Sequence, residues 1–420
     1  MPDKRLRNRP ENGRAGLFYG WVVVAATFFL LFAGFGAVYS FGAFFLVFGE
    51  EFGAGRAAVS SVFSYAVFTL FMTGALSGII ADRSGPKPVI AIGVTAVVIG
   101  LCGAAKSVTL WQLILCYTFG IGAGVGFFYV PAVSAVQRWF VRRRGLASGI
   151  AVTGIGVGTL VIPIVVDIML EHSGWRDALF VLAAVMAVFG IAGVALVEAD
   201  PAARGLAADG DDSGLTPLAD APDNDALRPI LTSRPFVQFY LASTILGVPV
   251  FMPFVHLIAS AEDLGIGTTQ AVLIFGLIGL GSTAGRFIIG AFADHLGRRR
   301  TLVGVLGGIG IAYTAWFCAT GAFLLCVFAL VFGICYGAYV ALSPALLADY
   351  FAGPNLSSVI GMQYTAAGFG SLFGPVLAGY FFDLTGGYTV ALVIGALCSA
   401  IACGLVMRMP EPAGIPGMGR

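Results

Sequence analysis

Long apolar runs, separated by short polar turns, recur along nearly the whole chain. Each run approaches or exceeds about 20 residues, the length that an α-helix needs to cross the hydrocarbon core of a membrane. The runs are continuous, whereas the strands of a membrane β-barrel alternate apolar and polar residues over about 10 positions. The pattern therefore predicts twelve transmembrane helices, over residues 17–48, 57–82, 87–105, 110–138, 143–170, 175–197, 235–261, 268–294, 301–319, 323–349, 355–383 and 388–407.

The interval between the sixth and seventh runs has a different character. Residues 198–231 hold seven aspartates and few large apolar side chains, so they bury too little apolar surface to fold by themselves. We interpret this interval as a solvated tether between two halves of the chain. The expected organisation is an N-terminal tail at 1–16, a six-helix bundle at 17–198, a linker at 199–233, a second six-helix bundle at 234–408 and a C-terminal tail at 409–420.

Composition and charge agree with a membrane protein and indicate its orientation. Hydrophobic residues make up 58% of the 420 residues and charged residues 11%, whereas soluble domains hold about 25% charged residues. Of the 23 lysines and arginines, 19 fall in the tails, the linker or the turns on one side of the predicted helices, three fall on the other side, and the last is Arg286. Because basic loops face the cytoplasm, we expect a multi-pass protein of the plasma membrane or cell inner membrane with both termini cytoplasmic.

The chain shows no residue pattern typical of catalysis, a cofactor or a metal site. The seven cysteines fall inside the apolar runs, where they serve as small apolar fillers, and no spacing typical of a disulfide or metal framework occurs. Gly120, Gly122 and Gly124 also lie within an apolar run, so they indicate close helix packing and not a phosphate-binding loop. We expect neither an enzyme nor a nucleic-acid-binding protein, and the partner of the apolar surface is the lipid bilayer.

A sequence repeat relates the two halves of the chain. Three residues of one short stretch recur 212 positions later: Gly78, Asp82 and Gly85 in GIIADRSGPK correspond to Gly290, Asp294 and Gly297 in GAFADHLGRR. Both stretches resemble the loop motif that the major facilitator superfamily carries after its second and eighth helices. That resemblance implies two six-helix bundles related by pseudo-symmetry, with a binding site between them and transport by alternating access.

The resemblance also implies a role for the charges at these paired turns. By it, Asp82, Arg83, Asp294 and Arg298 form a cytoplasmic gate that latches the bundles together and breaks when they rock. The alternative interpretation is that the two aspartates only cap tight turns at the ends of their helices.

Two further stretches carry a narrower resemblance. Residues 18–28, FYGWVVVAATF, and residues 138–154, RWFVRRRGLASGIAVTG, resemble the first-helix and fifth-helix signatures of the monocarboxylate transporter family. Bacterial oxalate/formate antiporters share much of this pattern. The family pairs an aspartate in its eighth helix with an arginine four residues later, and here Ser282 stands four residues before Arg286. A proton relay through that aspartate is therefore absent.

Arg286 is a permanent charge in the middle of the eighth run. It lies about 12 Å from the cytoplasmic end of the predicted helix at about 1.5 Å per residue, where an arginine costs about 2.5–3.5 kcal/mol on insertion scales. A carboxylate on another helix is one possible partner, but the acids inside the spans, Asp167 and Asp383, fall towards the outer ends. Because a guanidinium fits the two oxygens of a carboxylate, Arg286 is predicted to anchor an anionic substrate.

Further candidate site residues are a histidine and four tyrosines. His256 lies six residues before Glu262 in the seventh run. Since histidine titrates near neutral pH, we expect it to couple proton entry to anion entry if it faces the cavity; a neutral, hydrogen-bonded core histidine is the alternative. The resemblance places tyrosines in helices that face the central cavity, where a hydroxyl can bind the carboxylate and ordinary packing is equally compatible: Tyr39, Tyr129, Tyr336 and Tyr339.

Together these residues predict the substrate class. One intramembrane charge fits one substrate charge, and the eleventh run carries neutral polar residues, Gln363, Tyr364 and Thr365, where the oxalate-type antiporters have a lysine. We expect a secondary transporter that moves a small organic monocarboxylate anion, such as lactate or pyruvate, together with a proton. The alternatives are proton-independent carboxylate exchange and a non-transporting membrane sensor.

Overall fold

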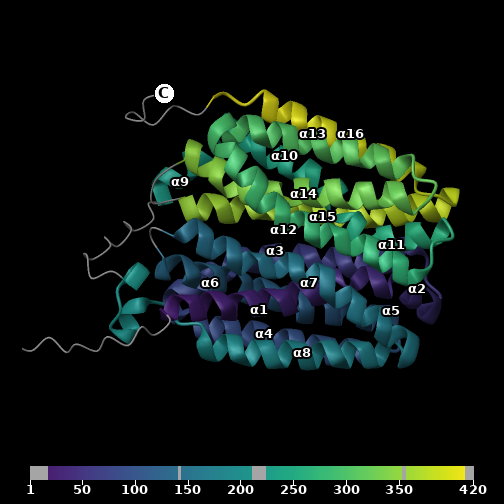
Figure 1. Cartoon of the computed structure of the whole chain (residues 1–420), viewed down its shortest axis with the longest axis horizontal. Helices are drawn as coiled ribbons and strands as arrows, with labels where there is room; N and C mark the ends of the chain where they lie inside the picture. Colours follow the sequence, from purple (N-terminus) through teal and green to yellow (C-terminus); the bar gives the residue numbers. More distant parts are fainter. Residues whose placement is uncertain (1–17, 141–142, 211–223, 352–355, 412–420) are drawn as a thin grey trace, which may run out of the picture.

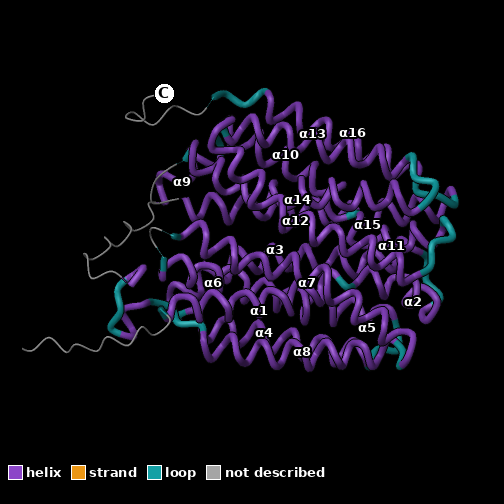
Figure 2. Tube along the Cα trace, viewed as in Figure 1, coloured by secondary structure: helices purple, strands orange, loops and turns teal. Residues whose placement is uncertain are grey.

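The computed structural model describes residues 18–140, 143–210, 224–351 and 356–411, and the regular elements among them are all helices (Figure 2). The first half contains α1 (Tyr19–Tyr39), α2 (Phe41–Phe52), α3 (Arg56–Ser84), α4 (Pro86–Ala105), α5 (Leu110–Leu115), the π-helix η1 (Cys116–Gly122), α6 (Ala123–Trp139), α7 (Arg144–His172), α8 (Trp175–Leu196) and the short 3₁₀ turns η2 (Pro201–Arg204) and η3 (Ala208–Gly210). The second half contains α9 (Asn224–Leu231), α10 (Arg234–Phe251), α11 (Pro253–Asp263), α12 (Thr268–Leu296), α13 (Arg298–Phe317), α14 (Ala322–Tyr350), α15 (Leu356–Thr385) and α16 (Thr389–Met407).

Within the described residues, twelve helical stretches are long and apolar enough to cross a membrane, so the predicted fold class is confirmed. Three of these stretches are not single α-helices: α1 continues into α2, α5 and η1 continue into α6, and α10 continues into α11. The hydrophobic pattern gave these spans as uninterrupted helices.

The breaks in the first and seventh spans have local causes. α11 begins at Pro253, which has no backbone N–H and cannot continue the hydrogen-bond ladder of α10. Ser40 separates α1 from α2, and its hydroxyl donates a hydrogen bond of 3.0 Å to the Ala37 carbonyl, a contact that bends helices. The corresponding helices of the two halves therefore both change direction part-way across the membrane.

The transmembrane helices form two bundles that lie against each other (Figure 1). α1–α8 make the first bundle and α10–α16 the second, and the two meet along two long seams, α3 against α15 and α7 against α12. The second seam depends on Gly156 and Gly279, because a Cβ on Gly279 would collide with the Gly156 carbonyl. Small residues allow membrane helices to approach this closely.

The helix α9 lies in the interval that the composition predicts to be an unstructured tether. Leu227 and Ile230 of α9 pack against the core, and α9 contacts α10 and α15. The difference arises because residues 227–231 are richer in apolar side chains than the rest of the interval. Residues 199–210 of the predicted linker are described and contain η2 and η3, whereas residues 1–17, 211–223 and 412–420 lie outside the described residues. The predicted domain boundaries stay a prediction.

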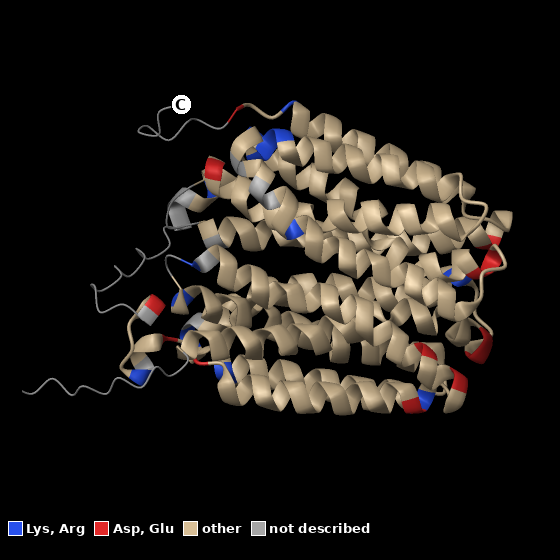
Figure 3. Cartoon of the chain, in the orientation of Figure 1, with Lys and Arg blue, Asp and Glu red and all other residues tan. Residues whose placement is uncertain are grey.

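Charged side chains gather at the two ends of the helices (Figure 3). We call the end with the α3–α4 and α12–α13 turns the basic end, and the opposite end, where Glu50, Asp263 and Asp383 lie, the acidic end. The two turns at the basic end share a backbone conformation, since Gly85 has a φ of 81° and Gly297 a φ of 86°. This region of backbone space favours glycine, so the sequence repeat has a matching repeat in local structure.

Candidate functional site

Arg286 lies on α12, at the seam between the two bundles. Its side chain is 8% exposed, and Nη1 donates a hydrogen bond of 2.6 Å to the Val152 carbonyl on α7. α14 packs against the other side of α12, so closely that a Cβ on Gly337 would collide with the Ser282 backbone. The hydrogen bond to Val152 therefore holds the guanidinium between the two bundles, and its predicted role as a substrate anchor stays a prediction.

Three polar atoms at this guanidinium have no partner among the described residues. Nε and Nη2 of Arg286 and Oγ of Ser282 are buried, and within the described residues none of them forms a hydrogen bond. No described carboxylate forms an ion pair with Arg286, and Asp383 instead contacts the start of α3 at the acidic end. Since buried polar groups are nearly always hydrogen-bonded, these three atoms indicate a binding position for a hydrogen-bonding ligand.

The unpaired nitrogens of Arg286 form one edge of the guanidinium. The N–H groups on Nε and Nη2 point in parallel, and this edge can bind both oxygens of a carboxylate at once. Nη1 belongs to the other edge and is already held by the Val152 carbonyl. The contact to α7 therefore orients the guanidinium and leaves its two-pronged edge free.

Four tyrosines surround the guanidinium. Tyr39 of α1, Tyr129 of α6, Tyr336 of α14 and Tyr364 of α15 all interact electrostatically with Arg286. The hydroxyl oxygens of Tyr39 and Tyr336 are 3.1 Å apart, and the hydroxyl of Tyr129 interacts with that of Tyr364. Both pairs join one bundle to the other, so the site is built by the two halves of the chain together.

Sequence reasoning selected three of these four tyrosines and missed Tyr364. A signal for it was present, because Tyr364 lies between Gln363 and Thr365 in an otherwise apolar span. Tyr339, the fourth tyrosine that the sequence selected, lies near Tyr364 and interacts with Ser243 and Ser343. Its hydroxyl is thus engaged within the second bundle, one helical turn from the site.

His256 lies in the interface between the bundles at the acidic end and is fully buried. Nε2 is 2.8 Å from the Pro375 carbonyl oxygen and 3.2 Å from the Ser60 hydroxyl, and Nδ1 is 3.0 Å from the Tyr388 hydroxyl. These partners fit a neutral ring that donates from Nε2 to the carbonyl and accepts at Nδ1 from Tyr388. The prediction that His256 couples proton entry depended on its ring facing the cavity. In this conformation the ring instead contacts both bundles where they close at the acidic end.

Arg56 ties the two bundles together at the same end. Its Nη1 and Nη2 donate to the carboxylate of Asp263 at 2.7 and 2.8 Å, and Nη1 also donates to the Tyr388 hydroxyl at 2.6 Å. Asp383 accepts hydrogen bonds of 2.9 Å from the backbone N–H groups of both Arg56 and Ala57. A carboxylate of the second bundle thus caps the N-terminus of α3, where negative charge is favourable. Sequence reasoning predicted none of these contacts.

The described polar contacts between the bundles lie at the acidic end or at the level of Arg286. At the basic end, the described ion pairs stay within one bundle: Lys87 with Glu198 at 2.7 Å and Arg299 with Glu411 at 2.6 Å. The hydrogen bond from Lys87 also holds the pKa of the Glu198 carboxyl below its usual value. The structure is therefore closed at the acidic end.

The predicted cytoplasmic gate is described only in part. The side chains of Asp82 and Asp294 lie outside the described residues, although both positions fall at the basic ends of α3 and α12. Arg83 is exposed, and Arg298 pairs with Asp349 of α14 inside the second bundle. The gate stays a prediction, and in this conformation Arg298 already has a partner within its own bundle.

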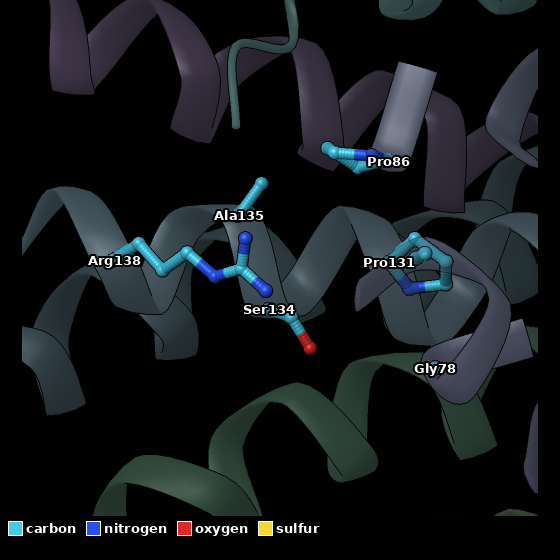
Figure 4. Close-up of a pocket in the computed structure, with 7 residues that line it drawn as sticks. Gly78, Pro86, Pro131, Ser134, Ala135 and Arg138 are labelled. Atoms are coloured by element: carbon cyan, nitrogen blue, oxygen red, sulfur yellow. The ribbon is translucent and has the colours of Figure 1, made fainter. Parts of the chain in front are cut away.

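Two cavities among the described residues lie away from Arg286. One, of about 10 Å³, lies near the basic end between residues that include Gly78, Pro86, Pro131 and Arg138 (Figure 4); it is large enough for one water molecule at most. The other, of about 510 Å³, is a groove along α12, α13 and α14. Neither of them contains Arg286.

The fold and the site together define a class of protein: twelve membrane-spanning helices in two bundles, with a polar site between them. The family model of the Major Facilitator Superfamily matches residues 27–258 and again residues 239–417. The chain belongs to this superfamily, and it is a membrane transporter, not an enzyme.

Named relatives and solved structures agree with that assignment. Monocarboxylate transporter 13 of Rattus norvegicus is 26% identical over 409 residues, which cover 96% of this chain and 91% of the relative. Monocarboxylate transporter 11 of Homo sapiens is 27% identical over 414 residues, covering 96% of this chain and 84% of the relative. The resemblance to monocarboxylate transporters seen in the helix signatures is thereby confirmed.

Among solved structures, a mutant of the nucleoside transporter NupG has a TM-score of 0.73 at 16% identity and covers 94% of this chain and 100% of its own. A bacterial homolog to the human lysosomal transporter Spinster, in an inward-facing and unoccupied conformation, also has a TM-score of 0.73, at 15% identity, and covers 95% of this chain and 99% of its own. At these identities the likeness shows the fold alone.

Proposed function

We propose that the chain is a proton-coupled symporter of a small monocarboxylate, such as lactate or pyruvate, that works by alternating access in a plasma membrane or cell inner membrane. The observation that carries the proposal is the free edge of Arg286, with Nε and Nη2 buried and unpartnered between the bundles. A carboxylate supplies the two acceptor oxygens and the negative charge that this edge lacks. Monocarboxylate transporters among the relatives support the same substrate class.

The surroundings of Arg286 favour a substrate with one charge and a small body. Tyrosines from both bundles interact electrostatically with the guanidinium, and their hydroxyl groups can donate to the carboxylate while their rings pack against an organic tail. Among the described residues, no second lysine or arginine lies with Arg286 and these tyrosines. A dicarboxylate would therefore bury one carboxylate without a partner, which is strongly unfavourable.

The closure at the acidic end supports alternating access with the basic end in the cytoplasm. Positive charge at one end fits the cytoplasmic side of a membrane, so the acidic end faces outwards and the described conformation is closed on its outer side. In the other half of the cycle the contacts of Arg56 and His256 break, and the site opens to the outside. The Arg286 site, which both bundles build, separates and re-forms once per cycle.

A second candidate function is carboxylate exchange without protons. It is favoured by one observation: the described polar side chains near Arg286 are tyrosines and a serine, with Ser282 at the place of the family's relay aspartate. Counterflow of labelled substrate against unlabelled substrate occurs in both cases. Accumulation driven by a pH gradient occurs only in a symporter. A non-transporting sensor would bind substrate and show neither.

The test is uptake of labelled lactate and pyruvate by the purified chain in proteoliposomes, with and without an imposed pH gradient. For one-to-one symport, one pH unit supports about tenfold accumulation. Arg286→Gln is expected to abolish both uptake and counterflow, whereas Arg408→Gln, at an exposed arginine of the basic end, keeps them. Wild-type uptake that ignores the pH gradient would refute proton coupling, and full activity of Arg286→Gln would refute the substrate site.

A further inference from the structure

A groove of about 510 Å³ runs along the outside of the second bundle. Ile289 and Phe292 of α12 and Ile334 of α14 line it together with Gly304 of α13. At Gly304 an added Cβ would meet no atom within 4 Å, so the missing side chain leaves room in the groove. The lining faces the membrane and is apolar over most of its length.

A free cation marks the end of the groove at the basic end. Arg300 and Thr301 line it there, at the beginning of α13 and so at the membrane surface. Arg298 and Arg299 are paired with carboxylates, at Asp349 and Glu411. Arg300 is exposed and, among the described residues, has neither an ion-pair nor a hydrogen-bond partner.

The first half of the chain lacks both features. At the positions 212 residues earlier, Ile92 replaces Gly304 and Pro88 replaces Arg300. Ile92 is 56% exposed, so a bulky side chain projects from α4 where α13 leaves space. Because the two halves share the same fold, the residues that open this groove and supply its cation, Gly304 and Arg300, are particular to the second bundle.

We propose that this groove binds an anionic phospholipid, with one acyl chain along Phe292, Gly304 and Ile334 and the phosphate at Arg300. An apolar groove accepts the chain, and an unpaired arginine at its membrane-surface end accepts the phosphate by charge-assisted hydrogen bonds. Basic pockets between helices at a cytoplasmic surface are typical sites for such head groups. Since α12 carries both Ile289 of the groove and Arg286 of the transport site, the lipid contacts the helix that holds the substrate.

The test uses the full chain, stripped of lipid in detergent and titrated with phosphatidylglycerol or phosphatidylcholine, with bound lipid counted by native mass spectrometry. The wild type is expected to hold phosphatidylglycerol about fivefold more tightly than phosphatidylcholine, the effect of one arginine at a membrane surface. Arg300→Gln removes this preference, and Gly304→Ile, which installs the residue of the first half, weakens binding of both lipids. Arg408→Gln, the matched exposed arginine, keeps the wild-type preference.

Three results would overturn the proposal. The first is an unchanged preference for phosphatidylglycerol in Arg300→Gln. The second is a rise in the melting temperature of the stripped protein with inorganic phosphate equal to that with phosphatidylglycerol, which assigns Arg300 to a free anion. The third is a dimer that persists without lipid and dissociates in Gly304→Ile, which assigns the groove to a second copy of the chain. If Gly304→Ile does not fold, the lipid preference of Arg300→Gln by itself tests whether the groove binds the anionic phospholipid.

Discussion

Replacement of Arg286 by methionine separates an arginine held for a ligand from one held for the fold. A central arginine costs about 2.5–3.5 kcal/mol on insertion scales, and the hydrogen bond from Nη1 to the Val152 carbonyl returns about 1.5–3 kcal/mol, as is typical for a charged donor. The balance is a net cost of about 1 kcal/mol. Arg286→Met is therefore expected to stabilise the empty protein slightly, with a melting temperature about 1–2 °C higher.

The same variant is expected to lose its response to substrate. A ligand at about 100 times its dissociation constant adds about 2.7 kcal/mol to the stability of the wild type, so a carboxylate that binds Arg286 raises the wild-type melting temperature and leaves that of Arg286→Met unchanged. The assay is thermal unfolding of the purified protein in detergent across a series of monocarboxylates. Arg408→Met serves as the control and should behave as the wild type.

The outcome that contradicts this reasoning is a marked loss of stability in Arg286→Met. A loss above about 2 kcal/mol would show that Arg286 has a structural partner whose removal leaves buried groups unpaired. A carboxylate that stabilises Arg286→Met as much as the wild type would place the binding site elsewhere.

Three other predictions follow from the same structure. Asp263→Asn removes the partly exposed ion pair with Arg56, which is worth at most about 1 kcal/mol. The acidic end should then open more often, and amide hydrogen exchange of α11 should be about fivefold faster. Unchanged exchange would mean that this ion pair does not hold the acidic end closed. Gly337→Ala is expected to lower the melting temperature because its Cβ collides with α12, whereas Gly307→Ala, where a Cβ meets no atom within 4 Å, should keep or raise it; equal effects would contradict the close approach. The hydrogen bond from Lys87 lowers the pKa of Glu198 in the folded protein. The contribution of this pair to folding stability is therefore fully present above the unfolded pKa of about 4.3 and disappears as the pH falls through the lower folded pKa. The melting temperatures of Glu198→Gln and wild type should converge at acid pH, and a constant difference between them would refute the linkage.

The helices and their order were predictable because membrane burial requires continuous apolar runs, and this signal is local in the sequence. The breaks inside the runs were not predicted. Ser40 and Pro253 interrupt spans that read as apolar throughout, and a serine or proline inside a membrane helix bends it in some contexts and not in others. The helix α9 was missed for the opposite reason, because Leu227 and Ile230 form it by packing on the bundle.

The candidate site was predictable where a residue violates a rule of membrane burial. Arg286 stands out in the sequence because a charge in an apolar run needs an explanation. The structure places it at the seam between the bundles, and its role as a substrate anchor stays a prediction. Tyr364 violates no such rule, because tyrosine is tolerated in membrane helices. Its polar neighbours Gln363 and Thr365 are a weaker signal, and its interaction with Arg286 in the structure identifies it. The closure by Arg56 and Asp263 joins residues 207 positions apart, a contact that the sequence of neither helix indicates.

His256 suggests how protons act on this transporter without entering the Arg286 site. In the closed acidic end, hydrogens run in one direction, from Arg56 Nη1 to the Tyr388 oxygen, from the Tyr388 hydroxyl to Nδ1 of His256, and from Nε2 to the Pro375 carbonyl. A protonated ring has no acceptor at Nδ1, so the hydrogen of the Tyr388 hydroxyl loses its acceptor, and a second positive charge is added beside Arg56. With the acidic end outside, as proposed above, we expect protonation from that side to favour the open acidic end and so the entry of the proposed anion. We predict that acidification of the outer side speeds substrate exchange in the wild type and not in His256→Gln, and an equal response of both in proteoliposomes would exclude His256 as the proton-sensitive group.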